Sequence, residues 1–130
     1  MTGRVLVADD DPASAELLMY FLESKGLTVV TAPDGNQAVE QGASGDFDVV
    51  ILDVHMPMYD GVEVLDLLRK RHVLRPIKVI AVTGDISDSV RGALEGGHID
   101  AYFTKPVDLP LLGAEVERLL AAQDRVTRFS

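Results

Sequence analysis

The sequence predicts an α/β fold in which a doubly wound parallel sheet carries helices on both faces. Five short apolar segments alternate with segments of helical length, an alternation typical of parallel strands joined by right-handed crossovers. The apolar segments are nearly uninterrupted, as in strands that are buried on both sides. A chain of 130 residues that is 47% hydrophobic has the size of one compact domain.

The five apolar segments are rich in β-branched or aromatic residues and are bounded by Gly, Pro or Asp, which predicts buried strands. They are VLVA (5–8), LTVVTA (27–32), DVVIL (48–52), KVIAVT (78–83) and AYFT (101–104). In open parallel sheets, ligands bind beyond the carboxyl ends of the strands. The residues that follow these five segments are therefore the candidates for chemistry.

The first helix is predicted over 12–25. Its large apolar residues recur on one helical face, which is expected to pack on the sheet: Leu17, Leu18, Phe21 and Leu22. Asp11 followed by Pro12 predicts an N-cap with proline at the first helical position, so Asp11 is assigned to capping rather than to ligand binding.

Four further helices complete the pattern. The spacing predicts them over 34–44, 60–71 and 86–96 and from residue 109 onward, and glycines dilute the one over 86–96. The last helix repeats apolar residues with a period of 3.6: Leu109, Leu112, Val116, Leu119 and Leu120. We expect the domain to span residues 1–123, with a loosely held tail over 124–130.

Composition excludes several classes of function. The net charge of −9 and a pI near 4.6 argue against nucleic acid or an anionic membrane as the main partner. The sequence contains no cysteine, so disulfides and thiolate metal sites are excluded. Neither a signal-peptide pattern nor a run of 18 apolar residues is present, and we expect a cytoplasmic protein.

Polar side chains follow four of the five predicted strands. Asp9 and Asp10 follow the first, Asp53 the third, Thr83 closes the fourth and Lys105 follows the fifth. Taken singly, each has an ordinary interpretation as a loop acid, a cap or an exposed lysine. Because four strands end at the same edge of the sheet, these polar residues are better interpreted together, as parts of one site. Carboxylates packed this closely repel by about 4 kcal/mol per pair at about 4 Å, so they need a compensating cation.

This set of residues suits phosphoryl transfer. Carboxylate oxygens are the ligands that Mg²⁺ prefers, together with water and phosphate oxygens. Asp53 can act as a nucleophile of the aspartyl-phosphate type. Lys105 supplies a fixed positive charge and Thr83 a hydroxyl, and both suit phosphate oxygens. The sequence thus predicts a site that accepts a phosphoryl group.

Four motifs resemble the receiver domain of two-component response regulators, over residues 3 to 123. They are VADDD (7–11), LDVHMPMYDG (52–61), VTG (82–84) and YFTKP (102–106). The resemblance implies a flavodoxin-like sheet with strand order 2-1-3-4-5 and five helices. It also suggests a cis peptide between Lys105 and Pro106, which a tertiary amide tolerates.

The resemblance further implies the role of each site residue. Asp53 is the phosphoacceptor, and Lys105 pairs with the phosphorylated carboxylate. Thr83 and Tyr102 are switch residues: the hydroxyl moves to the phosphoryl group, and the ring turns inward into the space that it leaves. The implied Mg²⁺ ligands are Asp9, Asp10, Asp53 and the main-chain carbonyl of His55.

The implied function is a signalling switch rather than a classical enzyme. A histidine kinase, a phosphotransfer protein or a small phosphodonor supplies the phosphoryl group, and the domain promotes its own phosphorylation and dephosphorylation. The face formed by the fourth helix, the fifth strand and the fifth helix then changes. The output is a downstream effector or a further domain outside this sequence, and a phosphorylation-dependent homodimer is left open.

Two other classes of protein have a phosphate-handling motif after the first strand. A haloacid-dehalogenase-like phosphatase would use Asp9 as nucleophile and Asp11 as acid, but Pro12 stands where that motif needs a hydroxyl or small residue, and the chain leaves little room for a substrate cap. A flavodoxin needs a hydroxyl- and glycine-rich phosphate loop after the first strand, whereas this chain has DDDPAS. The phosphatase remains the alternative.

Overall fold

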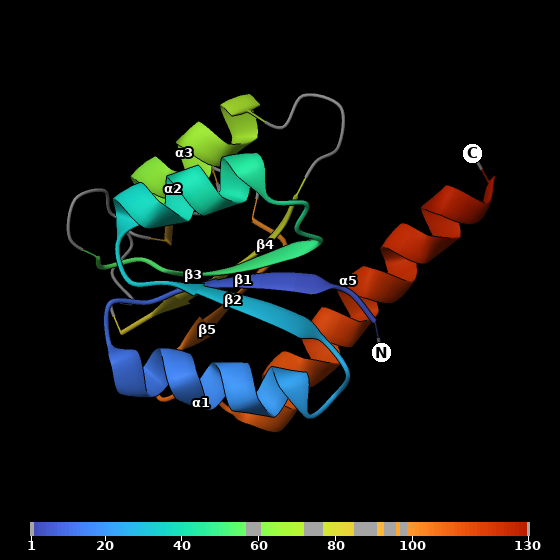
Figure 1. Cartoon of the computed structure of the whole chain (residues 1–130), viewed down its shortest axis with the longest axis horizontal. Coiled ribbons are helices and arrows are strands. Elements are labelled where there is room, and N and C mark those ends of the chain that lie inside the picture. The colour runs from blue at the N-terminus through green and yellow to red at the C-terminus, as the bar shows by residue number, and fades with distance from the viewer. Residues whose placement is uncertain are drawn as a thin grey trace.

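The protein is a five-stranded parallel sheet with helices on both faces (Figure 1). The computed structural model describes residues 2–56, 61–71, 77–84, 91, 92, 96 and 99–129. Along the chain, the elements are β1 (Arg4–Ala8), α1 (Pro12–Glu23), β2 (Thr28–Ala32), α2 (Gly35–Ser44), β3 (Val49–Asp53), α3 (Gly61–Arg71), β4 (Lys78–Thr83), β5 (Ala101–Thr104) and α5 (Leu109–Phe129).

The strand order is β2-β1-β3-β4-β5, and every pairing is parallel, which confirms the flavodoxin-like topology. β1 and β3 are neighbours although β2 separates them in the sequence, so the chain reverses its winding direction beside β1. Parallel order also brings the carboxyl ends of all five strands to one edge of the sheet. The crevice expected at that edge lies between β1 and β3.

The sheet is covered on both faces, as its uninterrupted apolar strands predict. In Figure 1, α1 and α5 lie on one face and α2 and α3 on the other. Alternate residues of the strands divide between the two sides. Val7, Ile51 and Ile80 pack with helices α1 and α5, whereas Leu6, Val50 and Val79 pack in a second cluster with residues of α2 and α3.

Capping residues fix where α1 and α2 begin. Asp11 accepts a hydrogen bond from the Ala13 N–H at 3.1 Å and another from the Ser14 hydroxyl at 2.9 Å, which confirms its predicted role as N-cap of α1. Asp34 does the same for α2 by accepting from the Gln37 N–H at 2.8 Å. The peptide between Lys105 and Pro106 is cis, as expected.

One residue of the predicted apolar face of α1 is placed wrongly by the sequence pattern. Leu18 and Leu22 are buried, and Phe21 packs beside them, but Leu17 is 57% exposed. On a helix Leu17 lies about 100° from Leu18, so a helix that touches the sheet along a narrow stripe leaves it on the flank.

Two further expectations concern segments that the structure describes only in part. The predicted helix over 86–96 lies largely outside the described residues, and those of its residues that are described are helical. Helix α5 continues to Phe129, past the expected domain boundary at residue 123, and that boundary stays a prediction. None of the helices in the described parts of the chain is long and apolar enough to cross a membrane.

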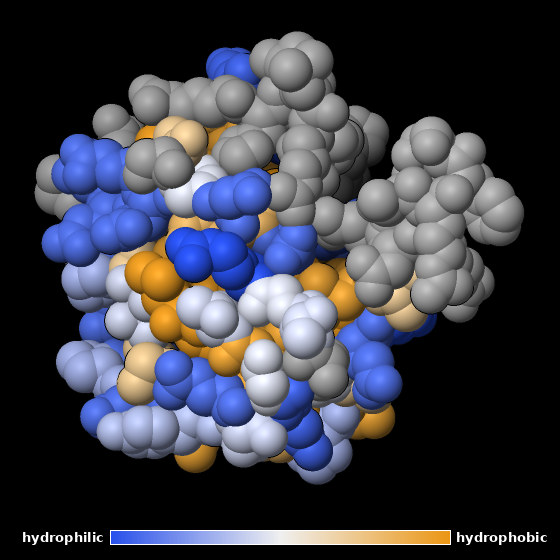
Figure 2. Space-filling view, turned by 45° about the vertical axis from the view of Figure 1, so that its right-hand side comes forward, coloured by the Kyte–Doolittle hydropathy of each residue, from blue (hydrophilic) through white to orange (hydrophobic). Residues whose placement is uncertain are grey.

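Figure 2 brings forward the side of the molecule on which the N-terminus lies. Hydrophobic residues reach the surface in the middle of this side and are surrounded by hydrophilic residues. The group of neighbouring carboxylates formed by Asp9, Asp10 and Asp53 lies instead at the edge of the sheet where the strands end.

The contrast between a buried and an exposed leucine provides a test of the packing. Leu112 of α5 is fully buried against the sheet, so Leu112→Ala is expected to lower the free energy of unfolding by about 2–5 kcal/mol. Leu17→Ala removes the same atoms from an exposed position, and its expected effect is below about 0.5 kcal/mol. Urea titrations of the two variants measure the difference. Equal losses would contradict the orientation of α1.

Candidate functional site

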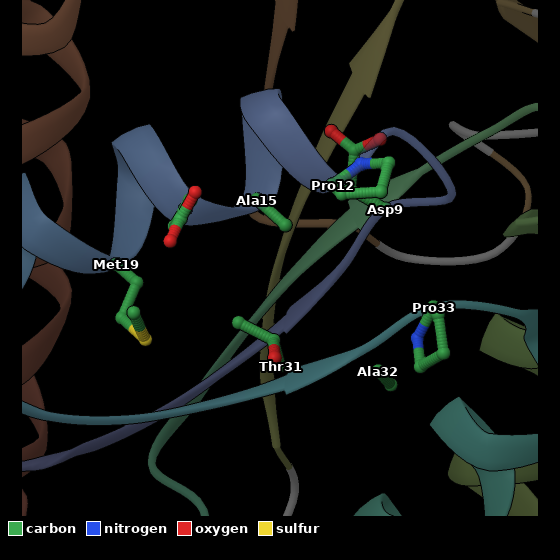
Figure 3. A pocket seen from close by; sticks show the side chains of 8 residues that line it. Asp9, Pro12, Ala15, Met19, Thr31, Ala32 and Pro33 are labelled. Atoms are coloured by element: carbon green, nitrogen blue, oxygen red, sulfur yellow. The ribbon is translucent and has the colours of Figure 1, made fainter.

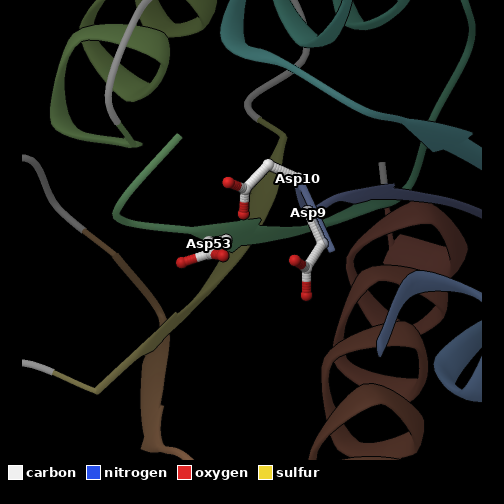
Figure 4. A group of neighbouring side chains, drawn as sticks. All are labelled: Asp9, Asp10 and Asp53. Atoms are coloured by element: carbon white, nitrogen blue, oxygen red, sulfur yellow. The ribbon is translucent and has the colours of Figure 1, made fainter. Parts of the chain in front are cut away.

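Three carboxylates meet at the carboxyl edge of the sheet (Figure 4). Asp9 follows β1, Asp10 comes next, and Asp53 is the last residue of the adjacent strand β3. One carboxylate oxygen from each lies within 4.8 Å of the others. Asp9 and Asp53 are each only 4% exposed, whereas Asp10 faces solvent. The sequence-predicted acidic cluster is therefore present, with two of its three members buried.

Main-chain groups orient the two buried carboxylates in the same way. Asp9 Oδ1 accepts from the Asp11 N–H at 2.9 Å, and Asp53 Oδ1 accepts from the His55 N–H at 3.1 Å. In each case the donor lies two residues after the aspartate, where the chain turns out of the strand. The second oxygen of each carboxylate is directed toward the same cation, Lys105.

Lys105 reaches the cluster from the end of β5, the edge strand of the sheet. Its Nζ lies 3.0 Å from Asp53 Oδ2 and 3.8 Å from Asp9 Oδ2. The main chain holds the lysine in place, because its N–H donates to the Thr83 carbonyl at 2.9 Å. About a third of the lysine side chain remains exposed. A single ammonium group thus faces the two buried carboxylates.

The pKa values reflect this crowding. Burial raises the pKa of Asp9, and the nearby Asp53 adds to the rise, although the Asp11 N–H and the charge of Lys105 act in the opposite direction. Burial by itself lowers the pKa of Lys105, but its hydrogen bond to Asp53 and the charges of the surrounding aspartates outweigh this effect and raise it. The lysine is therefore protonated at neutral pH.

Two other predicted site residues differ in their placement. Thr83 is the last residue of β4 and is 1% exposed, and it pairs in register with Thr104, the residue before Lys105. It therefore lies at the same edge as the acidic cluster. Tyr102 sits in the edge strand β5 and is 42% exposed. Unlike Thr83, it is therefore largely accessible to solvent in this structure.

Two grooves lead to Asp9 from the surface. One, of about 390 Å³, runs between α1 and the end of β2, and Figure 3 shows Ala15, Met19 and Pro33 along its walls. The other, of about 490 Å³, runs between α1 and the start of α5 and is lined by Lys105 and by apolar residues that include the exposed Leu17. The buried carboxylate of Asp9 thus borders both grooves.

One close contact at the site was not singled out by sequence reasoning. Gly61, the first residue of α3, donates its N–H to the Val54 carbonyl at 2.6 Å, directly beside Asp53. The only sequence signal was the glycine that ends the motif LDVHMPMYDG. Glycines often mark a close approach of two backbones, but the sequence does not tell which backbone is approached.

Fold and site together define a doubly wound α/β domain whose strand ends gather carboxylates and a lysine at the point where the winding reverses. The profile of the family described as response regulator receiver domain matches residues 5–117. The chain belongs to this family and is a receiver domain of two-component signalling.

The relatives agree with this assignment. The transcriptional regulatory protein TcrA of Mycobacterium tuberculosis is 40% identical over 116 residues, which cover 89% of this chain and 45% of TcrA. A CheY-like response regulator receiver domain protein from Methanospirillum hungatei has a TM-score of 0.89 and 28% identity, with coverage of 96% and 98%. The receiver domain of the sensor histidine kinase PA1611 from Pseudomonas aeruginosa, solved with a magnesium ion in its active site cleft, shares the fold, with a TM-score of 0.84, 23% identity and coverage of 93% and 99%.

The chain spans about half the length of the curated relatives that it matches. Several of these relatives are transcriptional regulators by name, and one solved relative is the receiver domain of a histidine kinase. The family match gives no support to the phosphatase alternative.

Proposed function

We propose that this domain accepts a phosphoryl group on the carboxylate of Asp53. The observation that carries the proposal is the placement of Asp53: it is buried at the end of the central strand, with one oxygen held by the His55 N–H and the other 3.0 Å from the Lys105 ammonium. A carboxylate oxygen attacks phosphorus, the bond from phosphorus to the donor breaks, and the donor leaves with the bonding pair. The donor is a phosphohistidine of a kinase or phosphotransfer protein, or a small acyl phosphate.

The carboxylates of Asp9, Asp10 and Asp53 suit Mg²⁺, because their oxygens are hard ligands and approach within 4.8 Å of one another. We assign these three side chains and the main-chain carbonyl of His55 as the residues that would hold the ion. A bound Mg²⁺ supplies positive charge that offsets the carboxylates and withdraws electron density from phosphoryl oxygens.

Lys105 orients the acceptor and stabilises charge on the phosphoryl oxygens during transfer. Its ammonium already contacts Asp53, and its raised pKa keeps it charged. After transfer it pairs with the phosphorylated carboxylate.

Thr83 offers its hydroxyl from the end of β4, and the exposed Tyr102 turns inward as Thr83 moves. The domain thus promotes its own phosphorylation and dephosphorylation, and phosphorylation changes the face that includes β5 and α5.

Intact mass after incubation with acetyl phosphate and Mg²⁺ tests the proposal. A receiver retains one phosphoryl group per chain, a phosphatase consumes the donor catalytically without retaining it, and a flavodoxin does neither. A protein whose mass is unchanged would contradict the proposal. Incubation with a phosphorylated histidine kinase then tests whether the same site accepts the phosphoryl group from a protein donor. Downstream, we expect the partner to be an effector protein or a further domain.

Magnesium is expected to stabilise the fold by mass action. At a concentration a hundredfold above its dissociation constant, a ligand that binds only the folded state adds about 2.7 kcal/mol, so the thermal midpoint should rise. Asp10→Asn removes one ligand and one repelling charge, so it should weaken this response without destabilising the metal-free protein. Glu117→Gln, an exposed acid on α5, is the charge-matched control and should respond as wild type does. An undiminished Mg²⁺ response in Asp10→Asn would remove Asp10 from the site.

A further inference from the structure

Gly61 packs directly on the peptide group that follows Asp53. A Cβ at this position would lie 2.6 Å from Val54 Cα and 2.7 Å from the carbonyl oxygen of Asp53. Cβ atoms essentially never approach other heavy atoms closer than 3.0 Å, and the obstructing atoms here belong to the backbone rather than to a flexible side chain. Only glycine fits at the start of α3 while β3 keeps its position.

The same peptide group is held from its other side by β4. The Val54 N–H, which belongs to this peptide group, donates to the Val82 carbonyl at 3.0 Å, and the Val54 carbonyl, which belongs to the next peptide group, accepts from the Gly61 N–H at 2.6 Å. The backbone that follows Asp53 is therefore confined between a strand and the first turn of a helix. The next residue, His55, donates its N–H to the Asp53 carboxylate, so a shift of this peptide also moves the side chain that it orients.

We propose that Gly61 is a positioning residue for phosphoryl transfer and for Mg²⁺ binding: by lacking a Cβ, it lets α3 hold the end of β3 where the Asp53 carboxylate meets Lys105 and the other two aspartates. The inference rests on the proposed role of Asp53 as acceptor. Gly61 acts through the backbone of Asp53 and Val54 and does not itself touch the reacting atoms.

The backbone displacement that a Cβ at position 61 would require indicates how much phosphorylation and Mg²⁺ binding should be impaired. An alanine at position 61 must displace the neighbouring backbone by about 0.4 Å to restore a separation of 3.0 Å. Metal-ligand distances tolerate only about 0.2 Å, and a misplacement of about 1 Å at a reacting centre costs about a hundredfold in rate. We therefore expect Gly61→Ala to slow phosphorylation by acetyl phosphate about tenfold at saturating Mg²⁺ and to weaken Mg²⁺ binding.

The matched control is a glycine whose crowding is remote from the site. A Cβ at Gly42 of α2 would lie 2.4 Å from Cδ2 of Leu68, a side-chain atom in the packing between α2 and α3. Gly42→Ala therefore also strains the core, but it does not press on the backbone of β3. It should lower the urea midpoint while leaving the phosphorylation rate and the Mg²⁺ affinity at wild-type values.

Calorimetric titration with Mg²⁺ and the initial rate of mass gain give two independent readouts. Loss of both in Gly61→Ala, with both retained in Gly42→Ala, is the expected result. The proposal is overturned if Gly61→Ala keeps wild-type Mg²⁺ affinity and rate, or if Gly42→Ala loses them equally at equal stability. Measurements in trimethylamine oxide keep a weakened variant folded. If wild type itself gains no mass, the acceptor role of Asp53 fails, and the Mg²⁺ titration still decides the role of Gly61.

Discussion

Asp53→Asn is expected to take up no phosphoryl group from acetyl phosphate under conditions that label the wild type. The substitution keeps the shape of the side chain but replaces a carboxylate by a neutral amide, which is a poor nucleophile and cannot form an acyl phosphate. It also removes the charge of one of the two buried carboxylates of this site, so the variant is expected to fold. Intact mass spectrometry measures the uptake, and circular dichroism verifies the fold.

Asp9→Asn is the matched comparison, because Asp9 is buried in the same cluster and contacts the same lysine. With Asp53 as acceptor, this variant retains a labelling site, although it loses a metal ligand and reacts more slowly. The opposite pattern, with label persisting in Asp53→Asn and vanishing in Asp9→Asn, would show that the phosphatase-like assignment of the nucleophile was right.

Lys105→Met is expected to slow phosphorylation about a hundred- to a thousandfold, the loss seen when one preorganised donor to a developing oxyanion is removed. The Nζ of Lys105 is 3.0 Å from the acceptor carboxylate, and methionine fills similar space without charge. Label should still accumulate on Asp53 over long incubation, which separates this variant from Asp53→Asn. Initial rates of mass gain at saturating Mg²⁺ provide the measurement.

Two further variants define what Lys105 contributes. Lys105→Arg keeps the charge but presents a planar fork in place of a compact ammonium, so it should recover only part of the rate. Lys70→Met removes a cation from an exposed ion pair on α3 and should leave the rate unchanged. A wild-type rate in Lys105→Met would exclude the lysine from the chemistry and leave it a structural partner of Asp53.

Much of the fold could be predicted because the strands are buried on both faces. An uninterrupted apolar run that ends in Asp, Gly or Pro leaves little freedom in its boundaries, and β1, β2 and β3 each begin within one residue of the predicted start. The edge at which Asp9, Asp53 and Lys105 meet followed from the same reasoning, since parallel strands end on one side. The assignment of roles to these residues came from the resemblance to receiver domains.

The features that the sequence could not predict are set by contacts between segments that meet only in the folded protein. The helical period groups Leu17 with Leu18, but the width of the stripe that α1 buries is set by the sheet beneath it, and Leu17 stays exposed. The position of Gly61 against the Asp53–Val54 peptide is a contact between two backbones, and no side-chain pattern encodes it. The ion pair between Arg69 of α3 and Asp100, beside β5, likewise joins segments that are distant in the sequence.

The pairing of β1 with β3 and of β4 with β5 has a consequence for synthesis on the ribosome. Asp9 and Asp53 are translated before Lys105, which is provided only after β5. A nascent chain from which β3 has emerged can bring Asp9 and Asp53 together, but without the lysine the two buried carboxylates repel each other. Parallel strands that are distant in sequence also pair slowly, because a long loop must close first. The full arrangement of two buried carboxylates around one lysine therefore forms only after β5 has been translated.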